Sequence, residues 1–113
     1  MNSSSSNNTH TTHAFKMQLK PGVVAAYKKR HDALWPELAA ALREAGIYDY
    51  AIFLDEDTLA LIGVLKRKPG FPFDDLAKQP VMRRWWDYMA DLMEVEPDNK
   101  PRQWPLTQVF QFD

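Results

Sequence analysis

Four short segments carry the apolar patterning that is typical of β-strands, and turn residues separate them. Residues 15–19 alternate apolar and polar side chains, which predicts a strand with one buried face, and Pro21-Gly22 ends it. The acidic turn at residues 55–57 separates two further segments that we interpret as a hairpin. The three remaining predicted strands are residues 48–54, 58–66 and 106–112.

The predicted hairpin strands, residues 48–54 and 58–66, are apolar on both faces. One face must pack against the helices. The other face should also be buried, because continuous apolar runs are typical of strands that are buried on both sides. In so small a domain, a second buried face indicates a partner chain. We therefore predict a homodimer that forms through the face of the sheet.

Apolar residues at helical spacing predict two helical regions. The first runs from about residue 23 to about residue 44, with Gly46 as its C-cap. Pro36 lies inside it, and a proline removes one helical hydrogen bond and clashes one turn back, so we expect a kink or a short break near residues 31–35. The second region starts near residue 74, has Pro80 as a first-turn residue, and shows a wide apolar face from residue 81 to residue 93.

The predicted elements follow the order strand, helix, strand, strand, helix, strand. This is the ferredoxin-like βαββαβ arrangement, an α+β fold with a four-stranded antiparallel sheet and two helices on one face. Two such sheets packed face to face give a dimeric α/β barrel. Residues 1–13 are polar and of low complexity, so we expect a disordered N-terminal tail followed by a single domain over residues 14–113.

Composition narrows the choice of partners. The 113 residues fit one domain, and 14 basic against 15 acidic residues give a net charge of −1, so electrostatics suggest neither a nucleic-acid nor a membrane partner. Cysteine is absent and two of the three histidines lie in the predicted tail, so we expect no metal site. The chain has no apolar run long enough to span a membrane and no signal core, which predicts a cytoplasmic protein.

The first helical region carries the candidate chemistry. Tyr27, His31 and Trp35 recur every four residues, so in a helix they lie along nearly one face. A hydroxyl, an imidazole and an indole in one line could transfer protons and stack on a flat ligand, but the same side chains could be core aromatics around a half-buried histidine. Trp85 and Trp86 point about 100° apart on a helix, so we expect one of them at an edge or lining a cavity.

Three blocks of the sequence resemble the L-rhamnose mutarotase family. They are Arg30-His31-x-x-Leu34-Trp35-Pro36-Glu37-Leu38, then Tyr48-Asp49-Tyr50-Ala51-Ile52-Phe53-Leu54-Asp55, and Arg84-Trp85-Trp86-Asp87-Tyr88-Met89-Ala90-Asp91-Leu92-Met93 with Pro97-Asp98-Asn99 after it. The similarity runs from about Phe15 to the C-terminus. The polar start of the chain and residues 67–80 depart from the family pattern, which leaves the rim of the pocket open.

The resemblance implies a dimeric enzyme that interconverts the α and β anomers of L-rhamnose in rhamnose catabolism, without a cofactor. The family's proton-donating histidine falls on His31. Its sugar-contacting residues fall on Tyr27, Tyr50, Trp85 and Trp86, all matched in type.

Mutarotation opens a sugar ring to an aldehyde and closes it on the other face, which requires one proton to be delivered to the ring oxygen and one to be removed from the anomeric hydroxyl. Histidine, with an ordinary pKa near 6.5, suits both roles. The group that handles the second proton stays open between Tyr27 and a bound water, and so does the preference among deoxyhexoses. Two other functions also remain: a cofactor-free or haem-binding oxidoreductase on the same dimeric fold, and a non-catalytic sugar-binding or dimerisation module.

Overall fold

The computed structural model describes residues 11–71 and 74–113. In these residues the chain forms the strands β1 (Thr11–Gln18), β2 (Ile47–Asp55), β3 (Ala60–Arg67) and β4 (Trp104–Pro105). Its α-helices are α1 (Val24–Asp32), α2 (Pro36–Glu44) and α3 (Pro80–Met89). Two 3₁₀ helices flank α3, and they are η2 (Asp74–Lys78) and η3 (Ala90–Leu92).

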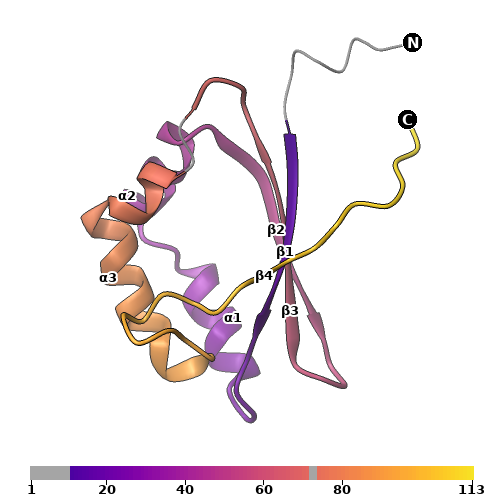
Figure 1. Cartoon of the computed structure of the whole chain (residues 1–113). Helices are drawn as coiled ribbons and strands as arrows, with labels where there is room; N and C mark the ends of the chain where they lie inside the picture. Colours follow the sequence, from indigo (N-terminus) through magenta and orange to yellow (C-terminus); the bar gives the residue numbers. More distant parts are fainter. Residues whose placement is uncertain (1–10, 72–73) are drawn as a thin grey trace.

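The strands form one antiparallel sheet in the order β2-β3-β1-β4, and the helices cover one face of it (Figure 1). The long hairpin of β2 and β3 lies at one side, and β1 joins it to the short β4. In the chain, α1 and α2 connect β1 to β2, and α3 lies between β3 and β4. The arrangement confirms the predicted α+β ferredoxin-like fold with a four-stranded antiparallel sheet.

The predicted break in the first helical region is confirmed, because α1 ends at Asp32 and α2 begins at Pro36. Trp35, between them, has extended backbone with φ −63° and ψ 131°. A residue that precedes proline is disfavoured in the helical conformation, and the proline itself fits the first turn of the next helix. The position of Pro36 therefore decides where the long apolar segment divides.

The hydrophobic core lies between the sheet and the helices. Helix α3 contributes four buried side chains at positions i, i+3, i+4 and i+7, the spacing of one helical face. These are Met82, Trp85, Trp86 and Met89. The sheet and the other helices contribute Met17, Leu19, Tyr27, Leu38 and Leu61, and the segment after α3 contributes Leu92 and Met93.

Two boundaries differ from the prediction. Residues Thr11 to His13, which were assigned to the tail, form the start of β1 and pair with β3, while residues 1–10 of that tail lie outside the described residues. The predicted strand 106–112 is not formed. The fourth strand is Trp104–Pro105 instead, and the side chains after it are exposed, with Val109 at 91%. The N–H of Leu106 still donates to the carbonyl of Ala14 at 3.0 Å, and the ladder with β1 ends at that point.

Candidate functional site

A cavity of about 1230 Å³ lies between the sheet and the helices. Tyr27 and His31 reach it from α1, Tyr50 from β2, and Trp85 and Trp86 from α3. The structure therefore brings all five predicted site residues to one cavity, although they come from three separate elements.

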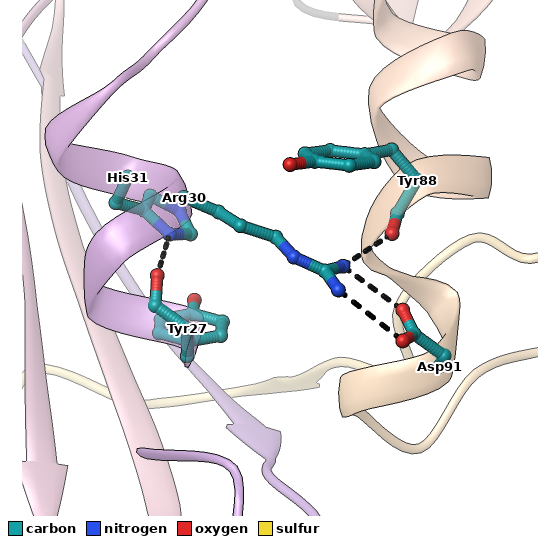
Figure 2. Close-up of polar contacts among 5 residues, drawn as sticks. All are labelled: Tyr27, Arg30, His31, Tyr88 and Asp91. Atoms are coloured by element: carbon teal, nitrogen blue, oxygen red, sulfur yellow. Dashed lines mark hydrogen bonds and ion pairs between the residues drawn. The ribbon is translucent and has the colours of Figure 1, made fainter. Parts of the chain in front are cut away.

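His31 lies in the last turn of α1, one turn after Tyr27. The two rings are tilted by 34° with their centroids 4.4 Å apart, and the ring of Trp85 meets the imidazole edge-on at 5.4 Å. The imidazole Nδ1 lies 3.1 Å from the backbone carbonyl oxygen of Tyr27 (Figure 2). Because a carbonyl oxygen only accepts, this contact favours the form with a proton on Nδ1 and leaves the lone pair on Nε2.

The surroundings of His31 favour its neutral form. Burial lowers its pKa below the ordinary value of 6.5, and this effect outweighs the backbone hydrogen bond to Tyr27 and the charge of Asp32, which both act to raise it. At neutral pH the resting imidazole is therefore unprotonated at Nε2. It can take a proton from a bound hydroxyl group and then return it, which is general base and general acid chemistry on one atom.

The two tyrosines supply hydroxyl groups from the helix side and from the sheet side. Tyr27 is buried, whereas Tyr50 is 39% exposed and lines the open cavity. Loss of hydration around each hydroxyl raises its pKa, to about 12 for Tyr50 although other parts of that side chain are exposed, and the proximity of Tyr50 raises the pKa of Tyr27 further. Both groups stay protonated near neutral pH, so each can donate one hydrogen bond to a polar ligand and accept others.

Tyr50 faces the cavity in the way that strand alternation predicts. Ile52 and Leu54, two and four residues later on β2, line the same cavity. The ring of Phe15 on β1 meets the Tyr50 ring edge-on, with centroids 6.2 Å apart. The aromatic ring of Tyr50 is thus held from the neighbouring part of the sheet.

The paired tryptophans both reach the cavity. We expected one of them at an edge or lining a cavity, and in the structure both line the cavity, while Trp85 at 5% exposed and Trp86 at 9% exposed also belong to the core. Trp35, the third member of the predicted aromatic line, is absent from the lining, and its ring packs edge-on against Trp85 at 5.0 Å.

Sequence reasoning missed several residues that line the cavity. His13 was placed in the tail, but it lies on β1 in the alternation that also points Phe15 and Met17 to the cavity. That period-two pattern was the signal that could have found it. Burial, together with the charge of Arg67, lowers the pKa of His13 below its ordinary value.

The sequence left the rim of the pocket undetermined, and the structure describes part of that rim. Leu76 and Ala77 of η2 line the cavity, while Pro72 and Phe73 lie outside the described residues. The loop before β4 supplies polar lining residues, Glu96, Lys100 and Gln103, and α1 supplies the charged side chains of Lys28 and Asp32. This loop is held by a hydrogen bond from the Glu96 N–H to the Lys100 carbonyl at 2.8 Å.

Two features are absent from residues 11–71 and 74–113, the part of the chain that the structure describes. Within that part of the chain, no three histidine or acidic side chains gather in a way that could hold a metal ion. In the same part of the chain, no helix has both the length and the apolar character needed to cross a membrane.

Comparison with known proteins gives consistent results. The sequence model of the L-rhamnose mutarotase family matches residues 12–112. An L-rhamnose mutarotase of Jannaschia sp. (strain CCS1) is 56% identical over 98 residues, which cover 87% of this chain and 94% of the relative. The crystal structure of an L-rhamnose mutarotase from Formosa agariphila has a TM-score of 0.85 at 45% identity, covering 91% of this chain and 99% of that one. A conserved protein from Methanosarcina mazei Go1 shares the fold alone, with a TM-score of 0.60 at 16% identity over 89% of this chain and 94% of its own.

Proposed function

The chain belongs to the L-rhamnose mutarotase family and is a carbohydrate isomerase. We propose that in its anomer exchange on L-rhamnose His31 is the residue that first takes the proton of the anomeric hydroxyl and then donates it back. The observation that carries the proposal is the placement of the His31 imidazole. It lines a cavity of sugar-accommodating size, holds its Nδ1 against a backbone carbonyl, and has a pKa lowered toward the neutral form.

The proposed reaction begins with the neutral imidazole. Nε2 of His31 takes the proton of the anomeric hydroxyl, the bond from C1 to the ring oxygen breaks, and a C1 carbonyl forms. The ring oxygen keeps the electron pair of that bond and takes a proton from a second donor, either the Tyr27 hydroxyl or a bound water. After rotation about the C1–C2 bond, the freed hydroxyl attacks the other face of C1 and returns its proton to that donor. The His31 imidazolium gives its own proton back to the C1 oxygen.

The aromatic residues around the cavity fit a deoxysugar. Trp85 and Trp86 offer apolar surface for the C–H face of the ring and for the methyl group of rhamnose, while Tyr27 and Tyr50 offer hydroxyl groups to its polar edge. We propose these four as the substrate-binding residues. Selection by a methyl-sized apolar contact is worth roughly 1–3 kcal/mol, so related deoxyhexoses should also react, more slowly.

NMR saturation transfer between the two anomeric protons of L-rhamnose tests this proposal directly. We expect transfer with the wild-type protein and a loss of roughly 10²–10⁴-fold in the exchange rate for His31→Ala, with an unchanged thermal melt. Lys29→Ala is the matched control, because Lys29 is exposed on the same helix and does not line the cavity. An exchange rate that His31→Ala leaves at the wild-type value would exclude His31 as the proton-transfer residue.

Membership of an isomerase family decides against the oxidoreductase alternative that the fold left open. It also disfavours the non-catalytic binding module, for which the same NMR experiment would show rhamnose binding without exchange.

We further propose the homodimer that the sheet pattern predicts. On β2 and β3 the side opposite the helices carries Phe53, which is 60% exposed, beside its cross-strand partner Ile62. After β4 the chain continues with exposed apolar side chains, among them Phe110 at 75% and Phe112 at 86%. Exposed apolar groups in such number are typical of a surface that another chain covers.

Light scattering at micromolar concentration tests the dimer. The chain has a mass of 13.1 kDa, so the proposal predicts twice that mass for the wild-type protein. Phe53→Lys should shift the particle toward the mass of one chain, whereas Lys29→Ala should not. A wild-type particle of 13.1 kDa would refute the dimer without bearing on the role of His31.

A further inference from the structure

We propose that Arg30, paired with Asp91, is a positioning residue that holds His31 in its reactive place by clamping the end of α1 to the end of α3. The inference rests on the proposed role of His31 and goes beyond it. Neither Arg30 nor Asp91 lines the cavity, so both would act on the reaction only through their neighbour.

The clamp has three hydrogen bonds from one guanidinium group (Figure 2). Nη1 of Arg30 donates to the backbone carbonyl of Tyr88 at 2.6 Å and to Oδ1 of Asp91 at 2.9 Å. Nη2 donates to Oδ2 of Asp91 at 3.2 Å. A bidentate pair of an arginine with a carboxylate fixes direction as well as distance, and the bond to the Tyr88 carbonyl fixes it relative to the backbone of α3.

Helix α1 has few other attachments, which gives the clamp its importance. Among its nine residues only Tyr27 is buried, and no side chain caps its N-terminus. The helix also ends one residue after His31, at Asp32. The ends of a short helix fray unless tertiary contacts hold them. The contact made by Arg30 lies next to His31 in the very turn that would fray.

A second path from Arg30 returns to His31 through aromatic rings. The guanidinium lies over the ring of Tyr88, 4.5 Å from its centroid, and that ring packs against Trp35 at 5.5 Å. Trp35 packs on Trp85 at 5.0 Å, and Trp85 meets the His31 ring at 5.4 Å. Arg30 thus supports the imidazole through the backbone of α1 and also through the rings that form its side wall.

The pair is better suited to positioning than to overall stability. The side chain of Arg30 is 21% exposed but that of Asp91 is 66% exposed. Water and salt screen such a pair, so its net effect on unfolding is small. A small displacement of a catalytic group, in contrast, can reduce a rate on the order of a hundredfold. The two effects can therefore be separated by experiment.

The test compares Asp91→Asn with Glu37→Gln. Both replace an exposed carboxylate by its amide, and both break an ion pair that ends on or beside α3, since Glu37 pairs with Arg84 at 3.5 Å. We expect Asp91→Asn to lower kcat for rhamnose anomer exchange about tenfold or more with little change in KM. We expect Glu37→Gln to match the wild-type protein, and Asp91→Glu to recover part of the lost rate.

Nitrogen NMR of the His31 imidazole separates positioning from a purely structural role. A purely structural role would leave the exchange protection of its Nδ1 proton unchanged. In the wild-type protein the Nδ1 proton should be present and protected from exchange by its bond to the Tyr27 carbonyl. In Asp91→Asn that protection should fall while the thermal melt stays within a few degrees of wild type. If Asp91→Asn unfolds the chain, Arg30→Lys, which keeps the charge but not the bidentate geometry, replaces it.

The outcomes separate the two proposals. Wild-type kcat and an unaltered His31 nitrogen spectrum in Asp91→Asn, with a severe loss in His31→Ala, would overturn the clamp and leave the proton-transfer role intact. A wild-type rate in His31→Ala would overturn the proton-transfer role, and the clamp would then be judged by imidazole protection alone. An equal loss of kcat in Glu37→Gln would also overturn the clamp, because it would show a general effect of breaking helix ion pairs.

Discussion

The Nδ1 atom of His31 lies 3.1 Å from the backbone carbonyl oxygen of Tyr27, one helical turn earlier. This contact favours the neutral ring with its proton on Nδ1, which leaves Nε2 as the basic atom. The same residue, Tyr27, stacks its ring beside the imidazole at 4.4 Å. One turn of α1 therefore sets both the tautomer of the ring and its immediate surroundings.

The pH dependence of the exchange rate follows from the direction of this pKa shift. Burial lowers the pKa of His31 below 6.5, and the proposed cycle starts from the neutral imidazole. The value of kcat/KM should therefore be constant above neutral pH and fall as the pH drops through the lowered pKa, approaching tenfold per pH unit. No decline should appear up to about pH 10, because the pKa of Tyr50 is raised to about 12.

Saturation transfer at a series of pH values, with the rate of His31→Ala subtracted at each, measures this profile. The subtraction removes the spontaneous exchange catalysed by acid and base in the buffer. A rate that declines as the pH rises from 5 to 7 would show that the protonated imidazole starts the cycle, which contradicts the sequence of steps proposed above.

Tyr50→Phe should weaken the binding of rhamnose without stopping the reaction. The substitution removes a hydroxyl that lines the cavity and keeps the ring that packs on Phe15. Loss of one hydrogen bond to the sugar is worth about 0.5–1.5 kcal/mol, which corresponds to a rise in KM of roughly two- to tenfold. Substrate titrations of the exchange rate measure KM and kcat separately. Tyr48→Phe serves as the control, since Tyr48 is absent from the cavity lining. A fall in kcat with KM unchanged would instead assign the Tyr50 hydroxyl to the reaction step.

The fold could be predicted from the sequence because its signals are local. Period-two alternation identified β1, two apolar runs on either side of an acidic turn identified β2 and β3, and Pro36 located the break between α1 and α2. The start of β1 was missed because polar Thr11 to His13 carry little apolar signal, although His13 continues the alternation toward Phe15. The shortness of β4 was missed because residues 106–112 have the composition of a strand, while pairing in a single chain stops near Pro105.

Some contacts of the candidate site could also be predicted from local spacing, and others could not. Tyr27 and His31 are one helical turn apart, and Trp85 and Trp86 are adjacent, so each pair could be proposed from spacing, and the resemblance joined them. The contact between Arg30 and Asp91 spans 61 positions in the sequence. Nothing in the local pattern of either residue indicates its partner, because arginine and aspartate on helix surfaces are usually solvated. Such a contact becomes visible only when the packing of α1 on α3 is known.

Gly63 links the stability of the sheet to the site. A Cβ atom at Gly63 on β3 would lie 2.5 Å from the ring of Phe15 on the paired strand, so that ring occupies the space above the glycine. Gly63→Ala should displace Phe15, whose ring supports Tyr50 at 6.2 Å. Overpacking of this kind typically costs about 1–3 kcal/mol of unfolding free energy, and the shift of Tyr50 should raise KM for rhamnose as well.

Urea denaturation followed by circular dichroism, with KM from the exchange assay, measures both effects of Gly63→Ala. The double variant Gly63→Ala with Phe15→Leu tests the cause, because a smaller side chain at position 15 makes room for the added methyl group. The double variant should be more stable than the sum of the two single changes predicts. Additive losses of free energy in the double variant would show that the glycine is required by the backbone of β3 and not by the ring of Phe15.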